Sequence, residues 1–589
     1  MNRTLEETSQ ERLAGGTRHG VVFVHGVGDQ RKSDTLLDMG GALLDWLTRW
    51  HKSRDEPAPC IECTELSFTA VDAGEGDTVP RATIRFRDGA GDRVWVLAEA
   101  WWAASNRRPG LGTMLGWSWT HLRSIMGHLI DSMTVRINRL TGREQDPLLP
   151  GRWALRVDVI NCLGMLAIYG IGAVLGYALL LPLMILAQIP SPGFQDFILL
   201  RLIKPFLVVN AGEFRTYLDD DIQSSNMHRR VAAVVTFLVE QEQCQDVSIV
   251  AHSEGAVVSF GMLTDRDSRL SDAQRRVRKF ITLGAGLNKS WQVKPDLKRL
   301  EGPIPSHIHW VDMWASYDPV PAGWLQPWLK DTSKDGGRWA RIFCPNEAVI
   351  AEQRLVPRPN PDPFHVQSPR WKRAPDDVYW PVSIFVTNKM NVVADHGAYL
   401  GNDEQVMVRI AAEIDRPNHR ESRYWRGQSI LTQDEEYTRE MILAVRRRRA
   451  RVTVLTLFRD IAALISLGLS IWLCLDLVNW KGIGALMTPI GGIKLHNGLA
   501  GLVASALNWL RQLPGFLGDL ANGVMVVPFS VLGSLALVVA VILIFSLCRT
   551  LFWDPMDQRA RLRAIAAMAT AVAPLAGRGR SEVPVTHPA

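Results

Sequence analysis

The sequence has little cysteine, and its few copies are badly placed for a disulfide framework. Seven cysteines occur in 589 residues, an odd number, and Cys162, Cys474 and Cys548 lie in strongly apolar stretches. A disulfide-stabilised secreted fold is therefore not expected. One CxxC motif, Cys60 to Cys63, has no second pair at zinc-ligand spacing, so we expect ordinary thiols and no metal.

The first twenty residues lack the apolar core that a secretory signal peptide needs. We therefore expect the N-terminal region to begin in the cytoplasm. A large excess of one charge sign is also missing, because the net charge is only +6. The basic runs flank apolar segments, and for that reason a nucleic-acid partner is not expected.

Charge is absent from three stretches of the chain, residues 159–195, 461–475 and 520–548. The first is long enough to enter a bilayer. The segment after it, 197–210, contains two charges, which favours an interfacial helix over a span. We expect a hairpin or re-entrant arrangement here, with a buried pair of soluble helices as the alternative.

Arginine clusters indicate the orientation of the C-terminal half. Five arginines occupy six positions over 446–451, and more follow residue 548, whereas the loop 481–519 contains only three basic residues. The positive-inside bias then predicts a transmembrane hairpin over 456–549 with both clusters in the cytoplasm. Asp476 leaves a buried soluble helix over 461–480 as an alternative. We expect the 446–451 run to set topology and contact lipid headgroups.

Short apolar runs alternate with helical stretches along the rest of the chain. This pattern predicts an α/β fold with a mostly parallel sheet, helices on both faces and additional membrane-inserted helices. The strands expected are 21–24, 81–87, 93–103, 247–250, 279–287, 307–315 and 382–390, with a helix over about 225–242. Because both halves of the sheet must lie on one side of a membrane, the insert between them crosses an even number of times or not at all.

These patterns predict seven consecutive regions. They are a flexible tail (1–18), a first part of the α/β domain (19–150), an apolar membrane-associated insert (151–210), a second part of the domain (211–415), a basic linker (416–455), a C-terminal transmembrane hairpin (456–549) and a basic cytoplasmic tail (550–589).

Four short motifs carry the chemistry. His25-Gly26 follows an early strand, and the serine of Ala251-His252-Ser253-Glu254-Gly255 lies between a strand and a helix. Asp318-Pro319-Val320-Pro321 follows a later strand, and Asp395-His396-Gly397-Ala398-Tyr399-Leu400 comes last. The order Ser, Asp, His is the one expected of an α/β-hydrolase. On these motifs the chain resembles the intracellular lipase-like and esterase-like members of that superfamily over about 19–150 and 206–415.

The resemblance implies a role for each motif. Ser253 is the expected nucleophile, His396 the base that takes its proton, and Asp318 the acid that orients the imidazole. The expected oxyanion hole consists of the backbone N–H groups of Val27 and Glu254. His25 and Gly26 belong to the loop that presents Val27.

The sequence departs from the usual pattern at two places, with Ala251 where glycine is common and an acidic residue directly after the serine. Asp312 is the alternative acid, but it lies within a strand. Among other histidines, we expect His252 to pack beside the serine. The remaining rivals for the base have less suitable contexts: His307, His309 and His365. Asp395 is adjacent to His396 and is not expected to pair with it.

The sequence therefore predicts a membrane-anchored serine hydrolase that cleaves acyl esters, with membrane lipids as substrates and no cofactor or metal. We expect a multi-pass protein of a bacterial inner membrane or an equivalent membrane, with its catalytic domain in the cytoplasm. The alternatives are a thioesterase or amidase that uses the same triad, and a membrane scaffold without catalysis. Fold alone does not decide among substrates.

Overall fold

The computed structural model describes a large part of the chain, and all structural statements below concern that part. The described residues are 17–28, 30–54, 60–62, 69–70, 78–86, 93–103, 109, 111–141, 156–166, 169–170, 173, 212–265, 271–294, 304–305, 307–315, 317–321, 325, 382–390, 394–415, 443–444, 446–457 and 554–571.

Eight strands form one mixed, mostly parallel sheet in the order β10-β9-β8-β7-β1-β6-β5-β2. From β10 to β6 every neighbouring pair is parallel, and β5 and β2 are antiparallel additions at one edge. The bounds are β1 (Thr17–Val24), β2 (Cys60–Glu62), β5 (Arg81–Phe86), β6 (Arg93–Ala100), β7 (Asp246–His252), β8 (Val277–Leu283), β9 (His309–Ala315) and β10 (Val382–Val386); a separate two-stranded sheet pairs β3 (Thr69–Ala70) with β4 (Thr78–Val79).

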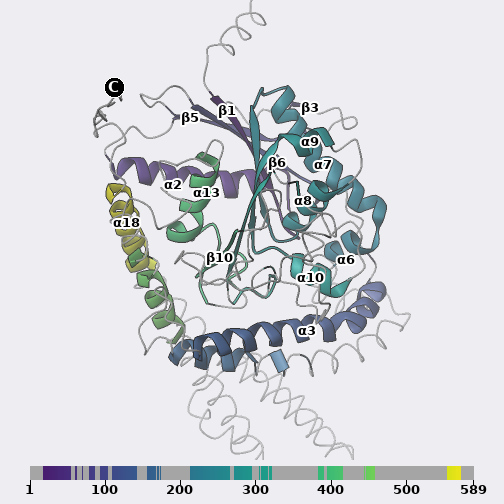
Figure 1. The fold of residues 1–589 in the computed structure, drawn as a ribbon, viewed down its shortest axis with the longest axis vertical. Coiled ribbons are helices and arrows are strands. Elements are labelled where there is room, and N and C mark those ends of the chain that lie inside the picture. The colour runs from purple at the N-terminus through teal and green to yellow at the C-terminus, as the bar shows by residue number, and fades with distance from the viewer. Residues whose placement is uncertain are drawn as a thin grey trace, which may run out of the picture. The chain divides into compact units, whose positions relative to one another are not determined.

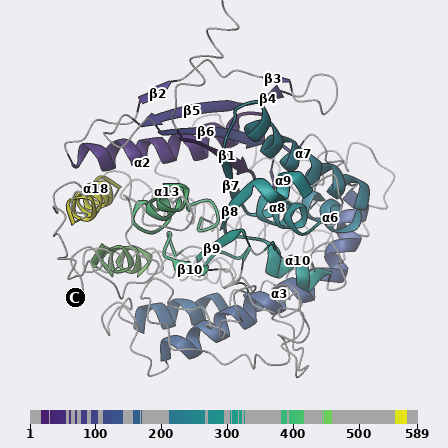
Figure 2. The ribbon, with the colours of Figure 1, turned by 45° about the horizontal axis from the view of Figure 1, so that its top comes forward.

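Helices cover both faces of the large sheet, as the sequence predicted (Figures 1 and 2). One face packs against the π-helix η1 (Leu36–Gly40), α2 (Gly41–Lys52), the π-helix η6 (Asp403–Met407) and α13 (Val408–Asp415). The other face packs against α6 (Gly212–Asp219), α7 (Asp221–Glu240), α8 (Glu254–Thr264), α9 (Ser271–Arg276) and α10 (Leu287–Val293). Two further helices are α3 (Leu111–Thr141) and α18 (Asp554–Ala571).

The central strands are apolar on both faces because helices cover both. In β1, Val22 and Val24 belong to the core under α7 and α8, whereas Val21 and Phe23 belong to the core under α2. Successive side chains of a strand point to opposite faces, so a strand buried on both sides is apolar throughout. This explains why β1 is an unbroken apolar run in the sequence.

Polar contacts set where α7, the helix before β7, begins. The Asp220 side chain accepts hydrogen bonds from the backbone N–H groups of Ile222 and Gln223, both at 3.0 Å, as an N-cap residue does. Helix α7 therefore begins at Asp221, four residues before the expected start. Its C-terminal end leads directly into β7, which pairs with β1 along residues 246–251.

The sequence predicted most strands but missed one large helix. The strands β1 and β7 belong to one sheet, as expected, and the structure shows that they are hydrogen-bonded neighbours. The segments predicted as strands 279–287 and 382–390 contain shorter strands, since Leu287 begins α10 and the chain turns after Val386. The 31-residue helix α3 was not predicted, although residues such as Leu122, Met126 and Leu129 recur at helical spacing.

The chain divides into two units, Met1–Thr453 with Arg561–Ala589, and Val454–Ala560. The sheet and its helices belong to the first unit. Most of the apolar insert lies outside the described residues, as do the runs 461–475 and 520–548 and the ends of the chain. Within the described part, no helix combines the length and the apolar character that a membrane span requires.

Candidate active site

The carboxyl ends of four parallel strands bring the predicted motifs together. His25 follows β1, Ser253 follows β7, Asp318 follows β9 by three residues, and His396 follows β10 by ten. In the sheet, β6 lies on one side of β1 and β7 lies on the other, so the strand order reverses direction at β1. Such a switch point at the carboxyl edge of a parallel sheet is where ligands bind in open α/β folds.

Ser253 has an unusual backbone conformation. Its φ is 58° and its ψ is −123°, a region that costs a non-glycine residue about 1–3 kcal/mol. Its N–H donates to the Leu283 carbonyl at 2.9 Å, which ties the turn to the end of β8. The side chain is 3% exposed. A serine in a strained turn between a strand and a helix is the arrangement of a nucleophile elbow.

Two glycines allow the β1 loop to approach this turn. A Cβ at Gly26 would lie 2.5 Å from the Ser253 Cβ, and one at Gly255 would lie 2.3 Å from the His25 carbonyl oxygen. Neither position therefore tolerates a side chain without movement of the backbone. By contrast, Ala251 fits within β7, where it is fully buried, so the departure from glycine at this position is accommodated.

A continuous line of hydrogen bonds joins the three expected residues. The Ser253 Oγ lies 2.8 Å from His396 Nε2. The His396 Nδ1 lies 3.0 Å from both carboxylate oxygens of Asp318. In the neutral imidazole, Nδ1–H then donates to the carboxylate and Nε2 accepts from the serine hydroxyl. This is the arrangement that lets an imidazole remove a proton from a serine.

Asp318 is held by two further donors. The Tyr399 hydroxyl donates to its Oδ2 at 2.7 Å, and the Val320 N–H donates to its Oδ1 at 2.9 Å. Tyr399 also accepts the Ala315 N–H at 3.0 Å. Burial raises the pKa of the Tyr399 hydroxyl well above its ordinary value, and the Asp318 carboxylate raises it further. Tyr399 therefore remains a hydrogen-bond donor at all working pH values.

His252 contacts the backbone and the ring of His396. Its Nε2–H donates to the His396 carbonyl at 2.8 Å, and the two rings lie 4.6 Å apart. Burial lowers the pKa of His252 to about 4, and the neighbouring His396 lowers it further. A neutral His252 with its proton on Nε2 can hold the His396 backbone but has no contact with the Ser253 hydroxyl.

The loop after β1 is fixed by the end of β6. The His25 and Trp102 rings stack 4.5 Å apart, and the Trp102 indole N–H donates to the His25 carbonyl at 3.0 Å. His25 Nδ1–H donates to the Gly26 carbonyl, and its Nε2 accepts the Trp102 N–H, so one tautomer satisfies both contacts. Burial lowers the pKa of His25 to about 4. Trp102 had no role in the sequence-based expectation.

The two residues expected to supply oxyanion-hole N–H groups lie at the start of α8 and in the loop after β1. Glu254 begins α8, where the first N–H groups have no carbonyl one turn earlier. The Val27 N–H has no acceptor within the described residues. The next N–H, of Gly28, donates to the Glu213 carboxylate at 2.9 Å, and Gly28 has φ +138°. Glu213, which the sequence did not single out, therefore holds this loop.

Glu254 places a buried acid beside the same loop. Burial raises the pKa of its carboxyl well above the ordinary value, and the nearby Glu213 raises it further. Neither carboxyl oxygen has a hydrogen-bond partner within the part of the chain that the structure describes. Burial and the nearby Glu213 thus both favour the protonated form of the Glu254 carboxyl.

The apolar insert also contacts the site. The Tyr317 hydroxyl donates to the Asp158 carboxylate at 2.9 Å and packs against Cys162. Tyr317 directly precedes Asp318, and the same apolar cluster includes Met390 from the loop before His396. The beginning of the insert thus touches the loops that bear both the acid and the base.

The rival residues lie elsewhere. Asp312 accepts the Thr282 hydroxyl at 2.7 Å. His307 contacts the Gln274 carbonyl and His309 lies near Glu413, whereas His365 lies outside the described residues. Asp395 accepts the Lys389 N–H and does not pair with its neighbour.

The described residues include no group of three or more metal-ligating side chains placed to hold an ion. Comparison with known proteins found no matching protein family, no matching characterised protein and no matching solved structure.

The low pKa of His25 predicts an acid-sensitive fold. An unfolded histidine titrates near pH 6.5, so between about pH 6.5 and 4 the unfolded chain binds more protons than the folded chain. Stability contributed by His25 is therefore full above about pH 6.5 and falls as the pH drops toward 4. His25→Gln, which cannot take up a proton, should make the urea midpoint less dependent on pH over this range. An unchanged slope would contradict the prediction.

The contact between Tyr399 and Asp318 predicts an effect on the reactivity of Ser253. Tyr399→Phe removes a hydrogen bond to a charged group, worth about 1.5–3 kcal/mol, and should slow the reaction of Ser253 with a fluorophosphonate about tenfold or more. Tyr317→Phe is the matched control, since it removes a buried hydroxyl that contacts Asp158 instead. Equal rates for wild type and Tyr399→Phe would show that the tyrosine does not orient the acid.

Proposed function

We propose that this protein is a serine hydrolase of the α/β-hydrolase fold that cleaves acyl esters of membrane lipids. The observation that carries the proposal is the hydrogen-bonded line from Asp318 through His396 to Ser253. The strained turn at Ser253, between a central parallel strand and a helix, supports the assignment of the fold.

The proposed reaction begins with acyl transfer. Ser253 Oγ attacks the ester carbonyl carbon while His396 Nε2 takes the hydroxyl proton. The Asp318 carboxylate stabilises the imidazolium that forms and does not itself take the proton. Negative charge moves to the carbonyl oxygen, where the N–H groups of Val27 and Glu254 donate to it. Each such donor is typically worth about 3 kcal/mol of barrier.

The second half returns the enzyme to its starting state. The tetrahedral intermediate collapses, His396 gives its proton to the leaving alkoxide, and an acyl-Ser253 ester remains. Water then attacks this ester while His396 takes a proton from the water. The second tetrahedral intermediate breaks its bond to the Ser253 Oγ, His396 returns the proton to that oxygen, and the carboxylic acid leaves. No metal or organic cofactor takes part in this scheme.

A lipid substrate and a membrane location are supported by apolar surface as well as by sequence. Trp119 of α3 and Ile160 and Leu163 of the helical residues 156–166 are 38%, 64% and 52% exposed. The same insert contacts the loop that carries Asp318. Together with the uncharged runs 461–475 and 520–548, this exposed apolar surface supports a multi-pass membrane protein. The arginines that flank these runs support a catalytic domain that faces the cytoplasm.

Covalent labelling tests the catalytic proposal. The full-length protein should react with a fluorescent fluorophosphonate at Ser253, and Ser253→Ala should abolish the signal. Ser259→Ala is the matched control, because Ser259 lies in α8, is fully buried and has an Oγ without a partner in the described part. A wild-type protein that does not react, or a Ser253→Ala variant that reacts equally, would favour the scaffold alternative.

The substrate class has its own test. Purified protein should release fatty acid from phospholipid or diacylglycerol vesicles, and the Ser253→Ala variant should not. Parallel assays with a water-soluble acyl thioester and an acyl amide cover the remaining alternatives. Turnover of the thioester or amide with no release from vesicles would contradict the lipid-ester proposal while leaving the triad intact.

A further inference from the structure

The arginine run before the second unit is partly buried in the first. Arg448 and Arg449 are 6% and 4% exposed, whereas Arg447 is exposed. The Arg449 guanidinium lies 4.7 Å from the centre of the Phe385 ring in β10. The expectation that this run contacts lipid headgroups is therefore wrong for Arg448 and Arg449, because both side chains are buried. The expectation that the run sets topology stays a prediction.

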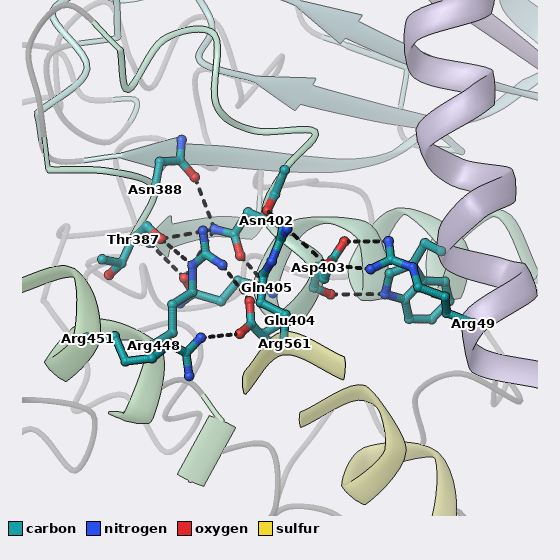
Figure 3. Close-up of polar contacts among 12 residues, drawn as sticks. Arg49, Thr387, Asn388, Asn402, Asp403, Glu404, Gln405, Arg448, Arg451 and Arg561 are labelled. Carbon is teal, nitrogen blue, oxygen red and sulfur yellow. Dashed lines mark hydrogen bonds and ion pairs between the residues drawn. The ribbon is translucent and has the colours of Figure 1, made fainter. Parts of the chain in front are cut away.

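Arg448 bridges two elements of the α/β domain. Its Nη1 lies 2.5 Å from Glu404 Oε2, and its Nε donates to the Thr387 carbonyl at 2.7 Å (Figure 3). Arg451 pairs with the other Glu404 oxygen at 2.7 Å. Glu404 is fully buried in η6. Burial alone would raise the pKa of Glu404, but Arg448 and Arg451 together keep it below its ordinary value.

Thr387 begins the loop that leads from β10 to His396. Besides the contact with Arg448, its carbonyl accepts the Asn402 side-chain N–H at 3.2 Å, and its N–H donates to Gln405 Oε1 at 2.8 Å. Asn402 also donates to the Asn388 side chain at 3.0 Å (Figure 3). The start of the loop is thus fixed to η6 on one side and to Arg448 on the other.

The same loop is closed just before the histidine. The Asn388 side chain donates to the Asp395 carbonyl at 3.0 Å, and the Lys389 N–H donates to the Asp395 carboxylate at 2.7 Å. These contacts set the backbone position of residue 395, and His396 follows it directly. Arg448 is thus linked to the base in steps: hydrogen bonds join Arg448 to Thr387 and Asn388 to Asp395, and the chain itself joins Thr387 to Asn388 and Asp395 to His396.

We propose that Arg448 is a positioning residue for His396, so that the segment before the second unit forms part of the hydrolase machinery. The inference rests on the proposed function, because it assigns a role within that site. Its physical basis is geometric. A small displacement of an imidazole at 2.8 Å from a hydroxyl is enough to lose productive alignment, and such misplacement costs up to about a hundredfold in rate.

The test compares two arginines of the same run in the full-length protein. The maximal rate of fluorophosphonate labelling at Ser253 should fall about tenfold to a hundredfold in Arg448→Met. The probe concentration that gives half this rate should stay within about twofold, since the substrate-facing groups are unchanged. Arg447→Met, which removes an equal charge from the surface, should label like wild type. Arg448→Lys should be intermediate, because one ammonium cannot reach both Glu404 and Thr387.

Hydrogen exchange provides a readout that does not depend on catalysis. In Arg448→Met, amides of 387–402 should exchange faster, while those of β1 and β7 keep their wild-type rates. Equal labelling and equal exchange in Arg448→Met and Arg447→Met would overturn the proposal. Faster exchange throughout the sheet would also overturn it, since that identifies a general stability effect. If wild type does not label, the proposed hydrolase function fails, and the positioning of His396 for catalysis fails with it.

Discussion

The strained turn at Ser253 is the constraint on which the candidate site depends. A serine with φ 58° is stable only where its surroundings fix the backbone. Here the Ser253 N–H bonds to the end of β8, and the loop after β1 lies so close that Gly26 and Gly255 exclude side chains. The hydroxyl is therefore positioned by contacts among three adjacent parallel strands.

The acid and the base are held by side-chain and loop hydrogen bonds, whereas Ser253 is held by the backbone of the strands around it. Asp318 and His396 lie on loops, where no strand pairing holds the backbone. Hydrogen bonds hold these two residues instead. Tyr399 and the Val320 N–H fix the carboxylate, while His252 fixes the His396 carbonyl. Further out, the Glu404 and Arg448 ion pair fixes the start of the same loop. A residue buried in the first unit just before residue 454 thus contributes to a site assembled around β7.

The sequence predicted the strands well because each central strand is apolar on both faces and bounded by polar turns. Ser253, Asp318 and His396 were predicted as a set because their motifs and chain order resemble those of α/β-hydrolases, and they meet because the parallel strands before them end at one edge of the sheet. Asp312 was separable from Asp318 for the same reason, since it lies inside β9. The helix α3 was missed although its apolar residues recur every three or four positions, because only the tryptophans and basic residues of this region were considered. Tyr399 belongs to the motif that contains His396, yet the sequence alone could not assign a partner to its hydroxyl.

What the sequence by itself determined is local: an apolar strand, a small-residue turn around a serine, and uncharged runs flanked by arginine. Only the tertiary structure decided that Glu213 holds the Gly28 N–H, that Trp102 stacks on His25, and that Arg448 is buried against Glu404. The residues of these pairs are separated by 44 to 185 positions along the chain. No periodicity or motif encodes such pairs, because their contact depends on how whole helices and strands pack.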